Sequence, residues 1–325
     1  WSLDLHYGLV TLTFSETMQS KYFNSSTVVL QSGARRFNCT GSQTVPDCPA
    51  YSSATSYRLN ANLYTNIYNA TSLYISMASA DYGAISLDDS FGTAASNTFL
   101  TLDQNCSLSE TMEWAEGIND GAGMQAAAIT ADVLAPAFYS WSLDFDSGIM
   151  DINFGEPVNA TSLIASNINF QEIENMGTNA AANIIALTGT NVTILTDNGS
   201  SQKINLGNVN MNKIKSLSPL ATLTSKTYIS FSQPAYKDMS GNDMSLAYVS
   251  IYDAKGTTSF TPDTTPPHLV SFDLNMNDNT LRLIFSETIN TFQLEVDQIT
   301  LQGERAEREG GVVDEDEHIA TNFTF

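Results

Sequence analysis

The chain has few of the features that most functional classes require. Of its 325 residues, 13 are Lys or Arg and 35 are Asp or Glu, which gives a formal net charge of −22. A protein that binds a phosphate backbone needs a basic surface, so this balance excludes nucleic acid as a partner. No apolar run approaches the ~18 residues of a membrane-spanning helix, so we expect no membrane span in this sequence.

Catalytic motifs are also scarce. The three histidines, His6, His268 and His318, fall in a predicted turn, a linker and a charged loop, and none is accompanied by a Ser or Cys nucleophile with an acid partner. There is no phosphate-binding loop and no dinucleotide fingerprint. We therefore expect a protein that is not an enzyme.

Only three cysteines are present. Cys39 and Cys48 bracket a short segment with a Gly and a Pro, which predicts a loop closed by a disulfide. Cys106 would then be free, paired outside the chain, or the true partner of one of the other two. Three cysteines allow three single pairings, and their spacing fits no zinc pattern.

What the sequence does contain is an internal repeat. Three stretches share an opening Ser-x-Asp, a second apolar run that ends in Glu, and a later strand-like run that ends in Gln. The repeated positions are Ser2, Ser142 and Ser271, then Glu16, Glu156 and Glu287, then Gln31, Gln171 and Gln302. Equivalent residues lie 129 to 140 positions apart, which indicates an array of like modules.

The repeats define three modules: residues 1–138, 139–267 and 268–325. The two boundaries share the pattern Thr-x-Asp-x-x-x-Pro, at 130–136 and at 261–267. Their prolines favour a stiff, extended linker. The third module carries only the start of the pattern, so it is predicted to be incomplete.

Within the second module, short alternating runs separated by turn residues predict about seven strands and an all-β sandwich. Glu156-Pro157 is expected to end the second of them. A turn or two of helix is predicted at 211–217, and another at 110–116 in the first module. The predicted strands are 141–145, 149–154, 167–173, 191–195, 202–206, 227–231 and 247–251.

With these motifs in place, the chain resembles the bacterial Ig-like repeats of surface-layer and adhesin proteins, and their relatives in very large surface proteins of algae and other protists. The resemblance rests on Leu-Thr-Phe-Ser-Glu16, Leu-Ile-Phe-Ser-Glu287, Ile299-Thr-Leu-Gln302, Asp238-Met-Ser-Gly-Asn242 and the linker 260–267. It implies tandem Ig-like β-sandwiches that serve as extracellular scaffolding, adhesion or filament modules, with no catalytic residues to carry over. The cysteine loop and a weaker Asp-Ser-Gly-Asn equivalent set the first module apart.

Several acidic positions invite a functional interpretation. The repeated Glu16, Glu156 and Glu287 could contact calcium or a glycan, although a polar residue that ends a strand explains them more simply. Asp238, Asn242 and Asp243 could converge on a cation, but we favour a structural turn. Calcium is kept as a candidate cofactor because hard carboxylate oxygens suit it, while no residue is assigned as a metal ligand.

Eight Asn-x-Ser/Thr sequons predict N-linked glycans on an extracellular chain. They lie at Asn24, Asn38, Asn69, Asn105, Asn159, Asn191, Asn198 and Asn322.

Together these features predict an extracellular structural protein, a glycosylated subunit of a surface filament or hair-like appendage. Two explanations of the third module stay open: the chain continues beyond Phe325, or another chain completes residues 268–325 by strand donation, in head-to-tail self-association. The alternative is an adhesin stalk or cell-surface binding protein whose ligand site lies outside this sequence.

Overall fold

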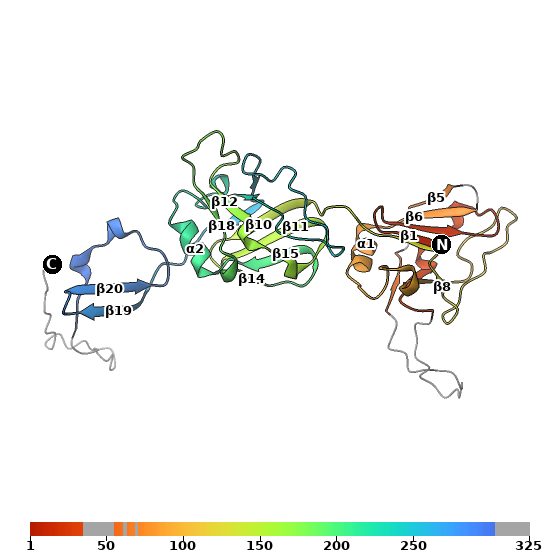
Figure 1. Ribbon diagram of the computed structural model, residues 1–325, viewed down its shortest axis with the longest axis horizontal. Coiled ribbons are helices and arrows are strands. Elements are labelled where there is room, and N and C mark those ends of the chain that lie inside the picture. The colour runs from red at the N-terminus through yellow and green to blue at the C-terminus, as the bar shows by residue number, and fades with distance from the viewer. Residues whose placement is uncertain (35–54, 61–63, 69–70, 303–325) are drawn as a thin grey trace, which may run out of the picture. The chain divides into compact units, whose positions relative to one another are not determined.

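A computed structural model describes residues 1–34, 55–60, 64–68 and 71–302. The chain is all-β in class: it consists mostly of strands in several sheets, and the described part has only two α-helices, α1 (Ser79–Ser86) and α2 (Gly207–Lys215). Neither helix is long and apolar enough to cross a membrane. The chain divides into two compact units, Trp1–Thr265 and Pro266–Phe325 (Figure 1).

The N-terminal half of the first unit contains two sheets, with the strand orders β5-β6-β2-β1-β9 and β4-β3-β7-β8. We call this part the first repeat. Its strands are β1 (Ser2–Asp4), β2 (Leu9–Thr13), β3 (Val28–Gln31), β4 (Ser56–Arg58), β5 (Tyr64–Tyr68), β6 (Ser72–Ser76), β7 (Phe99–Leu102), β8 (Met124–Gln125) and β9 (Ala128–Thr130).

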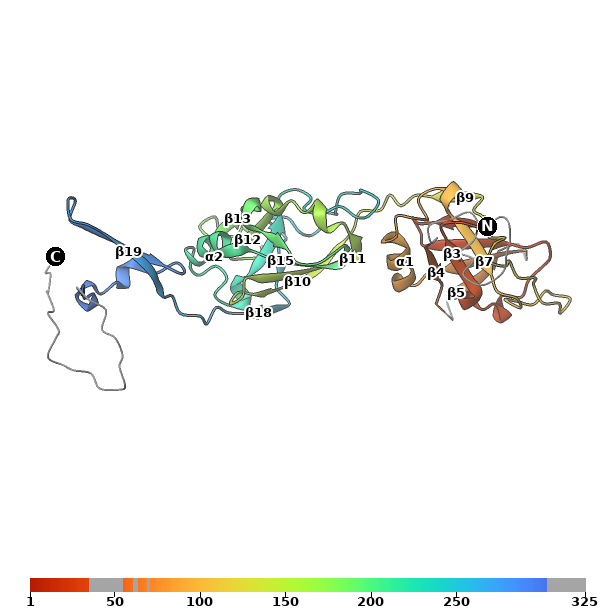
Figure 2. The same ribbon diagram turned by 90° about the horizontal axis from the view of Figure 1, so that it is seen from below.

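The second repeat, which follows in the same unit, has the orders β14-β15-β11-β10-β18 and β13-β12-β16-β17. In Figure 2 its strands β10, β11 and β15 lie side by side. The strands are β10 (Phe138–Asp144), β11 (Ile149–Val158), β12 (Ile168–Gln171), β13 (Ile184–Ala186), β14 (Thr193–Ile194), β15 (Gly199–Asn205), β16 (Tyr228–Phe231), β17 (Lys255–Gly256) and β18 (Ser259–Thr261).

The two repeats have the same topology, strand for strand. In each, an antiparallel hairpin (β1–β2 or β10–β11) is flanked by a parallel partner from the end of the repeat: Ser2 pairs with Ala128, and Ser142 pairs with Ser259. A pair of short 3-10 turns precedes the next strand in both, at Ser20–Tyr22 and Ser25–Thr27, and at Ala160–Ser162 and Ala165–Asn167. The sequence repeat is therefore also a structural repeat.

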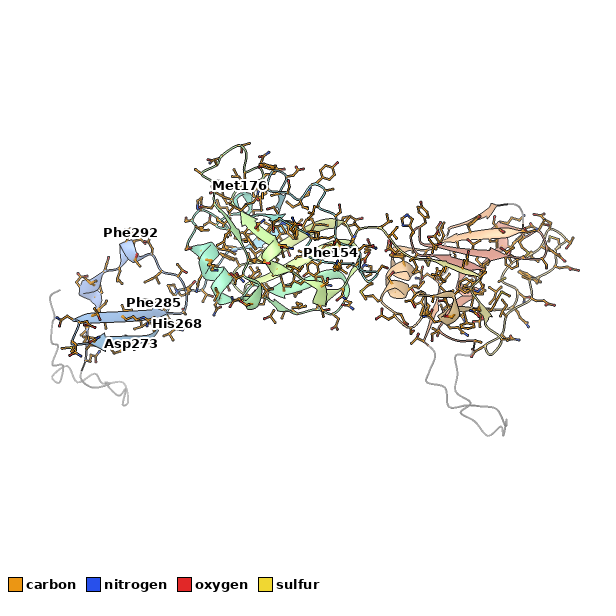
Figure 3. The ribbon with its side chains drawn as sticks, viewed as in Figure 1. Phe154, Met176, His268, Asp273, Phe285 and Phe292 are labelled. Atoms are coloured by element: carbon orange, nitrogen blue, oxygen red, sulfur yellow. The ribbon has the colours of Figure 1, made fainter. Side chains whose placement is uncertain are left out.

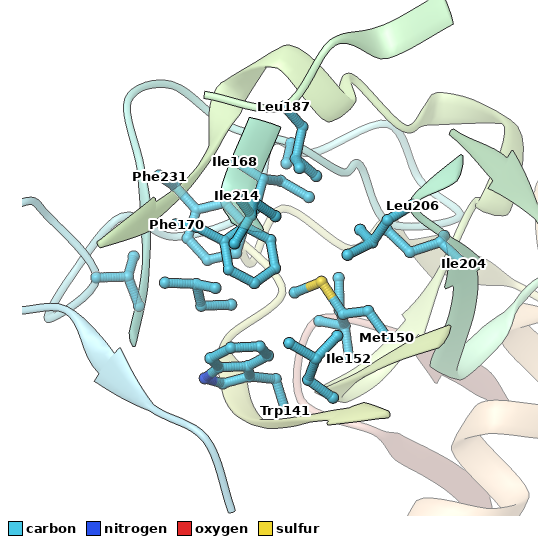
Figure 4. Close-up of a cluster of buried hydrophobic side chains, with 14 of the residues drawn as sticks. Trp141, Met150, Ile152, Ile168, Phe170, Leu187, Ile204, Leu206, Ile214 and Phe231 are labelled. Atoms are coloured by element: carbon cyan, nitrogen blue, oxygen red, sulfur yellow. The ribbon is translucent and has the colours of Figure 1, made fainter. Parts of the chain in front are cut away.

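The core of the second repeat lies between its two sheets and is made of side chains that alternate inward (Figure 4). Trp141 of β10 meets Phe170 of β12 edge to face, with ring centroids 5.6 Å apart. The Trp141 indole N–H donates to the Lys255 carbonyl at 2.8 Å, and the Trp1 indole N–H donates to the Met124 carbonyl at 2.7 Å. In each repeat the indole N–H therefore donates to a backbone carbonyl in a strand of the opposite sheet. The two tryptophans thus link the two sheets of their repeats.

The repeated glutamines have a structural role. Gln171 is fully buried, and its side-chain N–H groups donate to the carbonyls of Ile173, Glu174 and Ile251. Gln31 is equally buried and donates to Gly33. These bonds hold the backbone where the chain leaves the strand. Breaking them would leave buried polar groups without partners, which is costly in free energy.

The second unit contains the hairpin of β19 (Leu269–Asn275) and β20 (Thr280–Phe285), then 3-10 turns at Thr291–Gln293 and Val296–Gln298. All seven residues of β19 are exposed, as is Phe292 (Figure 3). The unit thus repeats the first elements of the other two repeats.

Some element predictions are wrong. Strand β11 continues through Glu156 and Pro157, because a register shift between Asn153 and Val158 accommodates a proline that cannot donate to the ladder. Residues 247–251 form turns rather than a strand, since Tyr248 is left-handed with φ 61°. Residues 110–116 form no helix, because Met112 is also left-handed with φ 67°.

A candidate proton-binding cluster between the two repeats

Three carboxyl groups converge within the first unit. Asp132 follows β9 in the linker, Glu156 lies at the irregular end of β11, and Asp238 follows β16 in a turn bridged to Val158. One carboxylate oxygen from each residue lies within 4.8 Å of one oxygen from each of the other two. Asp132 and Asp238 are 6% and 3% exposed, and Glu156 is half-buried. We call these three residues the acidic cluster.

Helix α1 of the first repeat supplies the fourth member of the site. The Tyr82 hydroxyl donates to the Asp132 Oδ2 atom at 2.8 Å and lies 3.4 Å from the Glu156 Oε2 atom. Helix α1 is brought close to β11 where Gly83 faces the Pro157 ring, 3.6 Å from where a Cβ at position 83 would stand. A residue of one repeat thus hydrogen-bonds both the linker and the next repeat.

The two aspartates are already hydrogen-bonded at both oxygens. Asp132 accepts from the Leu134 N–H at 2.9 Å in addition to Tyr82. Asp238 accepts from the backbone N–H of Asn242 at 2.7 Å and from its side-chain amide at 2.8 Å. The Asn242 amide also donates to the Asp132 carbonyl at 3.2 Å, so the turn 238–242 is fixed to the linker.

The electrostatics of the site favour a bound proton. The pKa of Glu156 is raised to about 7, first by burial, then by the negative charges of Asp132 and Asp238 and by a hydrogen bond to Asp132. Burial and Asp132 likewise raise the pKa of Tyr82, which stays a neutral donor. Like charges held together in a poorly hydrated place cannot all ionise, so Glu156 can hold the proton near neutral pH.

The same groups offer three carboxylates to a cation once that proton is lost. Calcium takes six to eight oxygen ligands, so water would have to supply about half of its shell here. Five of the six carboxylate oxygens already accept protein hydrogen bonds. The arrangement therefore suits a shared proton better than a calcium ion, and calcium binding stays a prediction.

The structure separates the acidic residues singled out in the sequence. Only Glu156 of the three repeated glutamates joins the cluster; Glu16 is exposed on the first repeat and Glu287 is in the second unit. Asp243 is not one of the three and pairs with Lys237 at 2.6 Å. Asp132 was missed as a site residue, although its linker motif was recognised.

The predicted modification sites fall in different environments. Asn24, Asn105 and Asn198 are exposed, Asn159 and Asn191 are partly buried, and Asn38, Asn69 and Asn322 lie outside the described residues. The predicted disulfide, Cys39 and Cys48, also lies outside them. Cys106 is a free, fully buried thiol whose pKa is raised to about 11 by burial. Glycosylation stays a prediction at every sequon.

Compared with models of known protein families and with curated proteins, the chain matches none.

Proposed function

We propose that this chain is an extracellular structural protein, a glycosylated subunit of a surface filament assembled from Ig-like β-sandwich modules at 1–138, 139–267 and 268–325. The observation that carries the proposal is the repeat itself: two successive strand sets have one topology, and a third begins with the same hairpin and paired 3-10 turns. Arrays of one module, without a catalytic constellation, are typical of spacers and fibres.

The contacts of the linker support a load-bearing role. The Pro136 carbonyl accepts from Ser245 at 3.0 Å, and the Ala137 carbonyl accepts from Gly155 at 2.9 Å. Tyr82 and Asn242 hold Asp132 from the two repeats that it joins. A linker that is bonded along its length restricts bending between modules, as a stiff filament requires.

The exposed hairpin of the second unit supports association through strand donation. In the two complete repeats, the hairpin is flanked by one strand on each side: β9 and β6, or β18 and β15. Among the described residues of the second unit, β19 and β20 pair only with each other, and β19 exposes Phe272 and Leu274. Strands from the head of a second copy would satisfy these edges.

Electron microscopy of the native, undigested material tests the proposal. A regular filament with an axial repeat of two to three modules is expected. Isolated rods without periodic contacts would contradict it and would favour the adhesin stalk. Mass spectrometry of tryptic peptides, with and without glycosidase, tests the glycans, and unmodified sequons throughout would remove that part of the proposal.

A further inference from the structure

Two tyrosines of the second repeat stand exposed on one short segment of the chain. Tyr248 is 72% exposed and Tyr252 is 60% exposed. Between them Val249 is fully buried, and its carbonyl accepts from the Phe231 N–H at 2.8 Å. The backbone of the segment is therefore fixed to the sheet, while both phenol rings lie in solvent.

The first repeat builds the same segment without these rings. Residues 117–124 correspond to residues 248–255 without a gap, because equivalent hydrogen bonds are equally spaced in the two repeats. These bonds join Leu102 to Ile118 and Phe231 to Val249 at one end, and Trp1 to Met124 and Trp141 to Lys255 at the other. The two exposed tyrosines therefore stand where the first repeat has Gly117 and Gly121. Since a glycine suffices at both places, neither ring is needed to build the segment.

The first of the two tyrosines is also held in an unfavourable backbone conformation. Its φ is 61°, in the left-handed region that is disfavoured for a residue with a Cβ atom. Glycine would adopt this conformation freely, and the exposed ring of Tyr248 gains little from burial in return. Residues held in such conformations cluster at ligand-binding sites, because function retains a side chain that stability does not favour.

Polar groups accompany the two rings. The Lys255 ammonium lies 5.9 Å from the centroid of the Tyr248 ring. Within the described part of the chain, this ammonium forms no ion pair, and the hydroxyls of Tyr248 and Tyr252 form no hydrogen bond. The Tyr252 ring lies 3.4 Å from where a Cβ at Gly177 would stand. The segment thus offers two aromatic faces, two phenol hydroxyls and one ammonium to a ligand.

The charge and the size of this surface limit the ligand. The net charge of −22 repels a polyanion, and the Lys255 ammonium repels a cation. A stable protein partner needs about 800 Å² on each side, whereas two tyrosines supply about 300–500 Å². A neutral sugar fits both limits: the C–H bonds of its ring are attracted to the electron-rich face of an aromatic ring, and its hydroxyls can pair with the phenols and the ammonium.

We propose that the segment 248–255 binds a neutral oligosaccharide, with sugar rings stacked on Tyr248 and Tyr252. A sugar hydroxyl accepts a hydrogen bond from the Lys255 ammonium, and the phenol hydroxyls bond to others. The inference rests on residues of the second repeat alone and goes beyond the filament proposal, so failure of either one leaves the other standing.

The test is isothermal titration calorimetry of the 325-residue chain with short neutral oligosaccharides of glucose, galactose, mannose, xylose and N-acetylglucosamine. Saturable binding of at least one of them is expected. Tyr248→Gly and Tyr252→Ala should each weaken that binding about fivefold or more, because each removes one stacking surface. Tyr7→Ala, a change at a 71% exposed tyrosine of the first repeat, is the matched control and should leave the affinity unchanged.

Thermal unfolding separates a binding role from a structural one. Tyr248→Gly should keep the melting temperature of the native chain, because relief of the left-handed conformation offsets the freedom that glycine adds to the unfolded chain. No binding of any neutral oligosaccharide, tighter binding of oligogalacturonate, or equal loss in the Tyr7→Ala variant would overturn the proposal. Self-association of the native chain in sedimentation velocity that Tyr248→Gly abolishes would also overturn it, because a second copy would then occupy this surface.

Discussion

Tyr82 of helix α1 and Asp132 of the linker share a hydrogen bond of 2.8 Å. This bond joins the body of the first repeat to the segment that enters the second. Its acceptor also belongs to a group of three carboxyls, so the geometry of the connection depends on how many of them are charged.

Tyr82→Phe removes the hydroxyl and leaves the ring in place. We expect a loss of about 1–2 kcal/mol in the free energy of unfolding, because a partly buried aspartate loses its donor. The pKa of Glu156 should also rise, since the Tyr82 hydroxyl lowers it. Urea unfolding followed by circular dichroism measures the change, with Tyr248→Phe, 72% exposed, as the control. Equal stability of the two variants would contradict the prediction.

Glu156 should make stability depend on pH. Its pKa is about 7 in the folded chain and 4.5 as a free side chain, so the folded state binds more protons between those values. Stability from this group is therefore fully present below about pH 4.5 and falls as pH rises towards 7. Glu156→Gln should remove this dependence.

Because Glu156 is half-exposed, solvent screening reduces the effect to about 1 kcal/mol, or about 2–4 °C in melting temperature. At pH 8 the Glu156→Gln variant should melt higher than the native chain, and at pH 4.5 the two should be close. Differential scanning fluorimetry from pH 4.5 to 8 measures the difference. A gap that stays constant over this range would show that Glu156 does not titrate as described.

An experiment with a chelator distinguishes whether the acidic cluster holds a shared proton or a bound cation. At pH 6, where Glu156 is protonated, EDTA should leave the melting temperature unchanged and millimolar calcium should add nothing. The Asp238→Asn variant, measured alongside, removes one charge and keeps one of the two hydrogen bonds that Asn242 donates to residue 238. A calcium-dependent rise in the native chain that is lost in Asp238→Asn would establish a cation site in place of a shared proton.

Two left-handed glycines of the second repeat form a matched pair. Gly207 begins α2 at φ 72°, and a Cβ there would collide with the Asn191 carbonyl, whereas Gly241, at φ 91°, faces open space. Gly241→Ala should cost about 1 kcal/mol from strain alone. Gly207→Ala should cost about 3 kcal/mol or more, because the backbone of residue 191 must also move. Similar losses in chemical denaturation would argue against the collision.

The sequence predicted the elements whose signal is local. Alternation and turn residues predicted the strands at 141–145 and 149–154, which pair as β10 and β11, and the turn favoured around Asp238 and Asn242 is present. The helix expected at 211–217 is α2, displaced towards the N-terminus. The all-β class followed from the same patterns.

The acidic cluster could not be read from the sequence in the same way. Asp132 and Asp238 are 106 positions apart, and only the bulged end of β11 brings Glu156 between them. Residues 247–251 have the apolar pattern of a strand, but they form turns because Tyr248 is left-handed. Alternation in the sequence does not reveal that conformation. Helix α1 was missed because its apolar residues show almost no periodicity.

The parallel pairing of β10 with β18 has a mechanical consequence. The chain enters the repeat at the start of β10 and leaves it at the end of β18, which lie at opposite ends of the same ladder. Tension applied along the polypeptide therefore loads these hydrogen bonds in shear, all together, and does not peel them apart one by one. The pairing of β1 with β9 gives the first repeat the same property, so each repeat can resist stretching through the pairing of its first strand with its last.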